Sequence, residues 1–407
     1  MLYAKERGRT SFQSLFDIKR ALATTKVGHT GTLDSFADGL LVVLSGKLTS
    51  LVNRVTDFDK TYEAVIKFGS ETDTLEIGGK VVKQTKLPKD VDFFMSLSKF
   101  EGKILQKPPV YSALHVDGMR ASDLIRQGEK IDLPEREVTV HSIEVLEILT
   151  SPLSFATLDK KALDMTSPDA SECGGGNCGG TCESCALSNK YVSYALIRFH
   201  VSKGTYIRSL ARDIGKTCGS SAHLIALRRT QVGPFKLEDA ANYKSLSKLD
   251  IREIARNSVN YTDTVEYQFE QKDEDSQKDY HKEILEKLMP LTPELASITG
   301  LVPMFLNPES LEHFFNGKPI YAKMFESIPK IVNEIGDGIG TDVQSANSSK
   351  YVTDTDGKGE SAERMNQCER VQIAVFVRKE TGDECVGLIS YMKRKFHYEK
   401  VFGRLDA

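Results

Sequence analysis

The chain has 407 residues, of which 40% are hydrophobic and 27% charged, a composition typical of a soluble protein with room for two domains. Its apolar runs are far shorter than the roughly 20 residues of a membrane span, and its start lacks the order of a signal peptide, so we expect a cytoplasmic protein without membrane contact. The net charge of −3 excludes a uniformly basic nucleic-acid-binding protein. Residues 201–240 hold seven Lys or Arg against three acidic residues, which leaves open a local basic face or a plainly mixed surface.

Hydrophobic periodicity predicts a mixture of helices and strands. The first helix spans about 12–23, where Phe12, Leu15, Phe16 and Leu22 are spaced for one buried face. The remaining predicted elements are helices over 89–99, 120–127 and 205–217, a short helix ending at Arg228, and strands over 62–68, 137–149, 191–201, 371–377 and 385–391. Because these elements do not alternate as βαβ units, the pattern predicts an α+β fold.

Two segments have the composition of insertions. Residues 335–366 are rich in Gly, Ser, Asp and Thr and lack periodicity, which predicts a disordered loop. The other segment, 152–190, carries four cysteines within 13 residues, at Cys173, Cys178, Cys182 and Cys185. Such thiolates are candidate ligands for zinc or an iron–sulfur cluster, but gaps of four, three and two residues do not match the usual two-knuckle zinc pattern. We therefore predict no metal and no other cofactor.

The most informative segment is Gly28–Asp34, which reads Gly-His-Thr-Gly-Thr-Leu-Asp and presents one carboxylate ahead of an apolar run at 40–44. A loop carboxylate read by itself is typical of a turn cap. Three further blocks follow it along the chain and change that interpretation. They are Lys60–Tyr62 leading into Gly69–Thr74, then Gln106–Leu114, then Ser202–Leu210 with Leu227–Thr230 close behind.

These four blocks, in this order over about the first 235 residues, resemble the signature of the TruB family of tRNA pseudouridine synthases. The resemblance implies a catalytic core with a mixed, largely antiparallel sheet around an RNA cleft. It also implies a reaction, the isomerisation of uridine 55 to pseudouridine in the T-loop of tRNA. The tail resembles a divergent PUA-like β domain, and a small β domain without RNA contact is the alternative. The implied parts are a pseudouridine synthase domain over 1–240, a helical linker over 241–290 and the accessory domain over 291–407.

The resemblance assigns catalytic roles to Asp34, Tyr62 and Arg208. Asp34 is the carboxylate that attacks the sugar, attacks the base or removes a ribose proton, and the sequence leaves these three alternatives open. A buried carboxylate stays ionised only beside a cation, and Arg208 supplies it through two parallel hydrogen bonds. A surface phosphate contact is the alternative for Arg208. Tyr62 stacks on the flipped base, with its hydroxyl within reach of carbon 5.

Six further residues are expected to bind the substrate. His29 helps to open the T-loop by occupying the space of the flipped base, and Leu227 closes against that base. Lys60 meets phosphate or braces the acidic site. The expected phosphate contacts are Lys203, Arg228 and Arg229, with a solvated charged face as the alternative. One departure from the family pattern is Asp38, which stands where a threonine is usual.

The expected partner is the T-arm of tRNA, recognised by its folded shape, with no guide RNA and with the enzyme as a monomer. Two other functions remain open from the sequence. One is a folding helper that unfolds and refolds tRNA without catalysis, and the other is an RNA-guided pseudouridine synthase. The Gly28–Asp34 loop resembles the stand-alone bacterial type more closely than the guided type.

Overall fold

The structure is a computed structural model that describes residues 1–112, 114–116, 119–129, 131–151, 190–259, 274–332 and 370–402. The chain forms two compact units, Met1–Leu288 and Met289–Ala407. The cysteine cluster at 173–185 and the segment 335–366 lie outside the described residues. Within the described part, no helix is long and apolar enough to cross a membrane.

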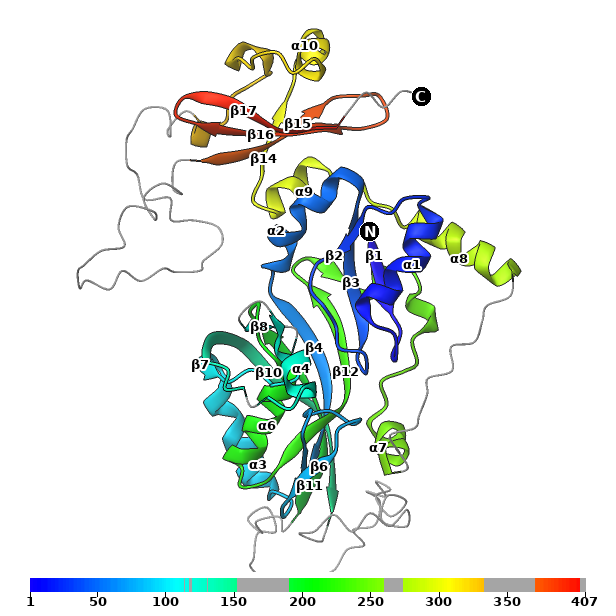
Figure 1. The fold of residues 1–407 in the computed structure, drawn as a ribbon, viewed down its shortest axis with the longest axis vertical. Coiled ribbons are helices and arrows are strands. Elements are labelled where there is room, and N and C mark those ends of the chain that lie inside the picture. The colour runs from blue at the N-terminus through cyan, green and yellow to red at the C-terminus, as the bar shows by residue number, and fades with distance from the viewer. Residues whose placement is uncertain are drawn as a thin grey trace, which may run out of the picture. The chain divides into compact units, whose positions relative to one another are not determined.

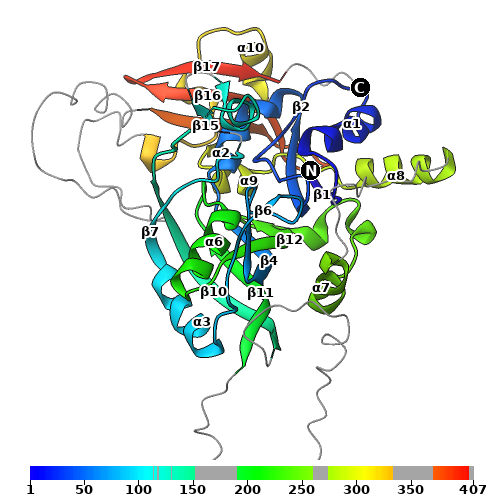
Figure 2. The ribbon, with the colours of Figure 1, turned by 60° about the horizontal axis from the view of Figure 1, so that its bottom comes forward.

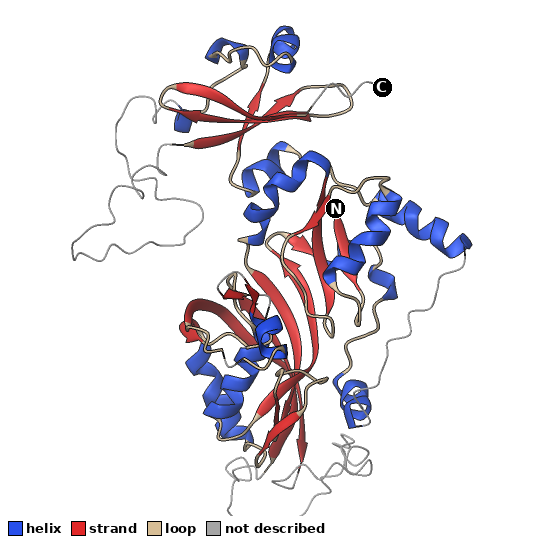
Figure 3. Ribbon diagram, in the orientation of Figure 1, coloured by secondary structure: helices blue, strands red, loops and turns tan. Residues whose placement is uncertain are grey.

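Unit 1 is built on a nine-stranded mixed sheet (Figures 1 and 3). Its main path runs β1-β3-β12-β4-β11-β10-β7, with β13 paired to β12 and β2 paired to β3. Every pairing is antiparallel except the short contact of β3 with β12. The strands are β1 Leu2–Lys5, β2 Val27–His29, β3 Asp38–Ser45, β4 Lys60–Phe68, β7 Gly102–Gln106, β10 Arg136–Ser151, β11 Tyr191–Val201, β12 Ala222–Val232 and β13 Phe235–Lys236. The predicted α+β class and largely antiparallel sheet are confirmed.

Helices cover both faces of this sheet because its central strands are apolar on both sides. Along β4, Ala64 and Ile66 join a core with α1, α3 and α6, whereas Val65 faces a second core with α7. Figure 2 shows α3 and α6 on one side of β10 and β11, and α7 on the other. The helices of unit 1 are α1 Ser11–Ala21, α2 Val52–Thr56, α3 Asp90–Leu97, α4 Ala121–Arg126, α6 Ile207–Thr217, α7 Ile251–Val259 and α8 Glu274–Glu286. Two hairpins complete it, β5 Ser70–Thr72 with β6 Val81–Gln84, and β8 His115–Val116 with β9 Met119–Arg120.

Two local predictions were wrong. The segment ending at Arg228 is not a helix but β12, which lies between β3 and β4. A short apolar run fits a buried helix and a doubly buried strand equally well, so periodicity alone could not separate them. The helix over 12–23 does form, as α1, but Phe12 and Phe16 face outward, and its buried face is Ser11, Ser14, Leu15 and Ile18.

The range 241–290, predicted as a helical linker, contains α7 and α8. Ile251 of α7 and Ile284 of α8 are fully buried in the cores of unit 1. Burial of these side chains removes apolar area from water and holds both helices against unit 1.

Unit 2 is a small four-stranded sheet in the order β14-β15-β16-β17. Strands β15 Val371–Val377 and β16 Glu384–Met392 match the two strands predicted for the tail. The other elements are β14 Val302–Phe305, β17 Lys395–Val401, α9 Pro293–Ile298 and α10 Leu311–Phe315. Phe314 of α10 is fully buried in the core of this sheet. A small C-terminal β domain is therefore confirmed.

Candidate active site

A cavity of about 560 Å³ opens in unit 1 where β4 and β12 lie beside the loop that precedes β3. Chain segments that are far apart in sequence meet at its wall, among them the loop carrying Asp34, strands β4 and β12, the start of β10, and the turn that leads into α6. The cavity is lined by Gly31, Thr32, Leu33, Asp34, Thr56, Lys60, Tyr62, Leu114, Arg136, Glu137, Val138, Lys203, Gly204, Thr205, Tyr206, Ile207, Arg208, Leu227 and Arg229.

Main-chain contacts on both sides of Asp34 hold its loop in place. The Ser11 hydroxyl accepts from the Leu33 amide at 2.9 Å and donates to the Leu33 carbonyl at 3.1 Å. On the other side, the Gly8 amide donates to the Ser35 carbonyl at 2.7 Å. The buried Lys5 ammonium donates to the same Ser35 carbonyl at 3.5 Å. The carboxylate between these anchors has little freedom to move, which is what a catalytic group requires.

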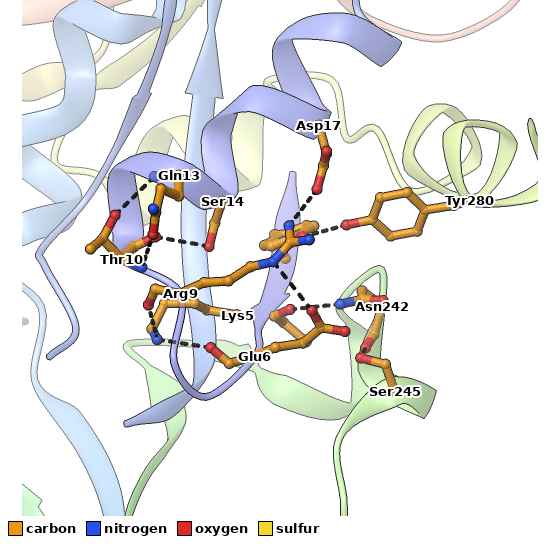
Figure 4. Close-up of polar contacts among 12 residues, drawn as sticks. Lys5, Glu6, Arg9, Thr10, Gln13, Ser14, Asp17, Asn242, Ser245 and Tyr280 are labelled. Carbon is orange, nitrogen blue, oxygen red and sulfur yellow. Dashed lines mark hydrogen bonds and ion pairs between the residues drawn. The ribbon is translucent and has the colours of Figure 1, made fainter. Parts of the chain in front are cut away.

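Lys5 also fixes the segment that leads into α1. Its ammonium donates to the carbonyls of Glu6 at 2.9 Å and Arg9 at 2.7 Å (Figure 4). Burial lowers the pKa of Lys5 to about 8, against the opposing effects of Asp38 and Asp34. These carbonyl contacts satisfy the donors of a buried ammonium and bind the N-terminal strand to the Asp34 loop.

Arg208 and Asp34 lie together as an ion pair, with one hydrogen bond in place of the two parallel hydrogen bonds expected from the resemblance. The Arg208 Nη2 donates to Asp34 Oδ1 at 3.1 Å, and Nε lies 2.9 Å from Oδ2 as an ion pair whose N–H is not aligned for a hydrogen bond. Nη1 donates to the Thr74 carbonyl at 3.0 Å and Nη2 to the Tyr111 carbonyl at 2.9 Å. The Arg208 side chain is only 5% exposed, whereas the Asp34 side chain is 35% exposed and lines the cavity. A buried guanidinium thus holds a carboxylate that substrate can reach.

A second carboxylate, Glu76, approaches the same guanidinium, with its Oε2 3.8 Å from Arg208 Nη1. Burial raises the pKa of Glu76 to about 7, Arg208 lowers it and the charge of Asp34 raises it. The Asp34–Arg208–Glu76 cluster thus has two acids and one base. Glu76 was not among the residues expected from the sequence, although it lies only two residues beyond the block Gly69–Thr74.

We predict that Glu76 makes folding stability fall as pH rises. Between its ordinary pKa of 4.5 and its folded pKa of about 7, the folded protein keeps a proton that the unfolded chain has lost. The free energy of unfolding of the parent, relative to Glu76→Gln, should therefore drop by at most about 3 kcal/mol between pH 4 and pH 8. Urea unfolding of the parent and of Glu76→Gln at pH 4 and pH 8 measures this change in the free energy of unfolding. Glu238→Gln, at a 63% exposed carboxylate, is the control, and a difference that is the same at both pH values would contradict the prediction.

Tyr62 and Leu227 form the apolar part of the cavity wall. Tyr62 lies on β4 and Leu227 on the neighbouring strand β12, and both side chains are buried in the core cluster. The two strands pair Leu227 with Ala64 and Arg229 with Tyr62. Residues 62 and 64 share a face of β4, so these apolar side chains lie together on the cavity side.

The two arginines of β12 do not have the positions predicted for phosphate contacts. Arg229 is 1% exposed, and it donates from Nε to the Leu40 carbonyl at 2.8 Å and from Nη2 to the Gly31 carbonyl at 3.1 Å. Arg228 is paired with Asp38 at 2.6 Å and 2.9 Å. Both guanidiniums are engaged inside the protein because β12 is a central strand. Arg229 braces the Asp34 loop from behind.

The other predicted cations differ in access. Lys60 lines the cavity but is buried, and its ammonium donates to the carbonyls of Thr56 and Phe58. Burial, followed by the charge of Arg229, lowers its pKa to about 8. Lys203 also lines the cavity, is exposed, and pairs with Asp57 at 2.8 Å. Of the predicted phosphate contacts, Lys203 is therefore the one whose charge is accessible.

His29 is half-buried on β2, five residues before Asp34. It is not one of the residues that line the active-site cavity in the described part of the chain. Its buried Nδ1 has no hydrogen-bond partner among the described residues. Burial lowers the pKa of His29, and the charge of Arg229 lowers it further. A hydrogen bond with the Gly31 backbone raises the pKa against both effects and ties the ring to the loop that carries Asp34.

Comparison with protein families places the chain beside enzymes that act on uridine. Residues 19–162 match the model of the TruB family pseudouridylate synthase N-terminal domain. Residues 208–264 match that of the tRNA pseudouridylate synthase B C-terminal domain.

Among curated relatives, tRNA pseudouridine synthase B of Treponema denticola is 38% identical over 364 residues, which is 86% of this chain and 91% of the relative. The enzyme of the same name from Borreliella burgdorferi is 37% identical over 252 residues, 62% of this chain and 75% of its own. A solved chain of an H/ACA RNP bound to a substrate RNA containing 2′-deoxyuridine has a TM-score of 0.49 and 19% identity, covering 100% of this chain and 86% of that one. The family models and the curated relatives thus agree with the cavity chemistry: the chain belongs to the TruB family of pseudouridylate synthases and is an isomerase.

Proposed function

We propose that this protein converts uridine 55 in the T-loop of tRNA to pseudouridine. The observation that carries the proposal is the ion pair between the 5% exposed Arg208 and the cavity-facing Asp34. The relatives named tRNA pseudouridine synthase B support tRNA as the substrate class. We further propose that the enzyme acts as a monomer on the T-arm, without a guide RNA.

The size and lining of the cavity suit one flipped nucleotide. Its volume of about 560 Å³ lies within the range of small-molecule sites, roughly 300–1,000 Å³, and cannot admit a duplex. A uridine inside a folded RNA loop must therefore leave its stack before it reaches Asp34. Tyr62 and Leu227 offer a ring and an alkyl wall to the extruded base, and the exposed Lys203 is suited to its phosphate.

The reaction conserves atoms and needs no change of oxidation state. The N1–C1′ bond breaks, uracil turns within the cavity, the C5–C1′ bond forms, C5 loses a proton and N1 gains one. Arg208 fixes the Asp34 carboxylate through an ion pair and a hydrogen bond, so the carboxylate is positioned to bond or stabilise the separated fragment. The Tyr62 hydroxyl is assigned to the proton on C5.

The direct test uses tRNA transcript labelled with tritium at C5 of uridine, incubated with the purified protein alone. Release of one tritium per tRNA, and none from a transcript with cytidine at position 55, would support the proposal. Release from both transcripts would reject position 55. A requirement for an added guide RNA would reject the stand-alone mechanism. Faster tRNA refolding without any release would favour the folding helper.

Tyr62→Phe should bind tRNA like the parent but fail to complete the reaction. The ring that contacts the base remains, while the hydroxyl assigned to proton transfer is lost, so we expect a loss of about 10²–10⁴-fold in the single-turnover rate. Quench-flow tritium release measures that rate, and filter binding measures affinity. Tyr194→Phe, which removes a buried hydroxyl from the opposite face of the sheet, is the matched control. Parent-like turnover by Tyr62→Phe would leave only stacking as its role.

A further inference from the structure

Helix α1 carries an apolar surface that the fold does not use. Its inward side chains, Leu15 and Ile18, are buried, but Phe12 is 58% exposed and Phe16 is 51% exposed. The two rings form an edge-to-face pair with centroids 5.3 Å apart and an interplanar angle of 79°. Single exposed apolar residues need no explanation, whereas two adjacent exposed aromatic rings mark a surface for contact.

The ammonium of Lys19 lies over this pair, 5.0 Å from the Phe12 centroid and 5.8 Å from the Phe16 centroid. Among the described residues, Lys19 has no ion-pair partner. The only acid of the helix, Asp17, is turned toward Arg9, with 2.7 Å between them (Figure 4). We call Phe12, Phe16 and Lys19 the α1 stripe, a surface that is both aromatic and positively charged.

The α1 stripe begins beside the active-site cavity. Phe12 follows Ser11, whose hydroxyl makes two hydrogen bonds to the backbone of Leu33 in the cavity wall. At about 1.5 Å per helical residue, Lys19 lies roughly 10 Å farther along the helix axis than Phe12. The N-terminal end of the α1 stripe is thus anchored to the cavity wall through Ser11, and the stripe extends away from that anchor along the helix.

We propose that the α1 stripe stacks an unpaired base of the RNA whose target uridine occupies the cavity, a proposal that rests on the function proposed above. Aromatic side chains beside cations are the usual platform for single-stranded nucleic acid, because every base has a face for stacking and the backbone is anionic. Lys19 contributes attraction for the phosphate, and the two rings contribute the stacking surface.

The chain provides its own matched control. Phe94 of α3 is 49% exposed and makes an edge-to-face contact with Phe93, but the first turn of its helix carries Asp90 and Asp92. It offers RNA a ring without a favourable charge. Comparing variants of Phe94 with variants of Phe12 and Phe16 therefore distinguishes a specific role of the α1 stripe from the general effect of an exposed ring.

The first experiment exploits the absence of tryptophan from the chain. Phe16→Trp and Phe94→Trp each introduce one tryptophan fluorophore. Each variant is titrated with tRNA to saturation, and tritium release from the same sample confirms that the bound tRNA reaches the active site. We expect quenching and a spectral shift for Phe16→Trp alone, because a base stacks on its indole. An equal response of both variants, or no response of either, would overturn the proposal.

The second experiment measures affinity. The Phe12→Ala, Phe16→Ala double variant should bind tRNA about 10-fold more weakly, with an unchanged single-turnover rate at saturating tRNA, while Phe94→Ala stays within two-fold of the parent. Circular dichroism checks that α1 still folds. Parent-like tRNA affinity of the double variant would overturn the proposed role of the α1 stripe in RNA binding. If sedimentation also showed that the variant had lost self-association, the stripe would be a protein interface instead. Absence of tritium release by the parent would instead reject the proposed function.

Discussion

Asp34→Asn is expected to bind tRNA within a few-fold of the parent and to form no pseudouridine. The amide has nearly the shape of the carboxylate, so cavity and RNA contacts persist. It cannot serve as nucleophile or charge stabiliser, and its NH₂ group would face the donors of Arg208. We expect the single-turnover rate to fall by at least about 10³-fold, as for the loss of other essential catalytic groups. Tritium release with enzyme in excess over tRNA measures this rate.

The matched control is Asp38→Asn, only four residues away. Asp38 is also paired with an arginine, Arg228, at 2.6 Å, but it does not line the cavity. That variant should lose stability because it leaves a buried guanidinium without its charge partner, yet it should retain most of its activity. Substantial activity of Asp34→Asn, or equal losses in the two variants, would show that Asp34 is not the reacting carboxylate.

Arg208→Lys should impair chemistry and stability together. Lysine keeps the charge, but its single ammonium cannot reproduce contacts to both Asp34 oxygens and to the carbonyls of Thr74 and Tyr111. We expect a 10²–10³-fold lower single-turnover rate, roughly equivalent to the loss of an oriented electrostatic group. We also expect a free energy of unfolding lower by about 1–3 kcal/mol, since buried acceptors lose their donors.

Arg198→Lys supplies the comparison for that experiment. Arg198 on β11 also makes paired contacts, at 3.2 Å and 2.8 Å to one Glu63 oxygen, but it is 41% exposed and outside the cavity lining. An exposed ion pair contributes little, so rate and stability should stay close to those of the parent. If Arg208→Lys reacted at the parent rate while losing stability, Arg208 would be a structural residue and the origin of Asp34 reactivity would lie elsewhere.

Local sequence determined the elements whose side-chain pattern is unambiguous. Strands 62–68, 137–149 and 191–201 were predictable because long alternating or β-branched runs favour strands, and they are found as β4, β10 and β11. The pairing of Asp34 with Arg208 could be anticipated from the family resemblance, since both residues lie within blocks of that signature. No local pattern joins two residues 174 positions apart.

Tertiary structure alone decided the features that depend on what lies opposite a segment. The run at 222–232 became a strand because β3 and β4 offer backbone partners on both sides. That placement buried Arg229 and turned it from an expected phosphate contact into a support for the Asp34 loop.

The same reason applies to Glu76 and to α1. The position of Glu76 beside Arg208 follows from the docking of its segment on β12, which no spacing in the sequence encodes. Helical periodicity grouped Phe12 and Phe16 with the core, but α1 lies so that Leu15 and Ile18 fill the core and the two phenylalanines face outward. Sequence defines which residues share a helix face, whereas the packing of the whole sheet decides which face is buried.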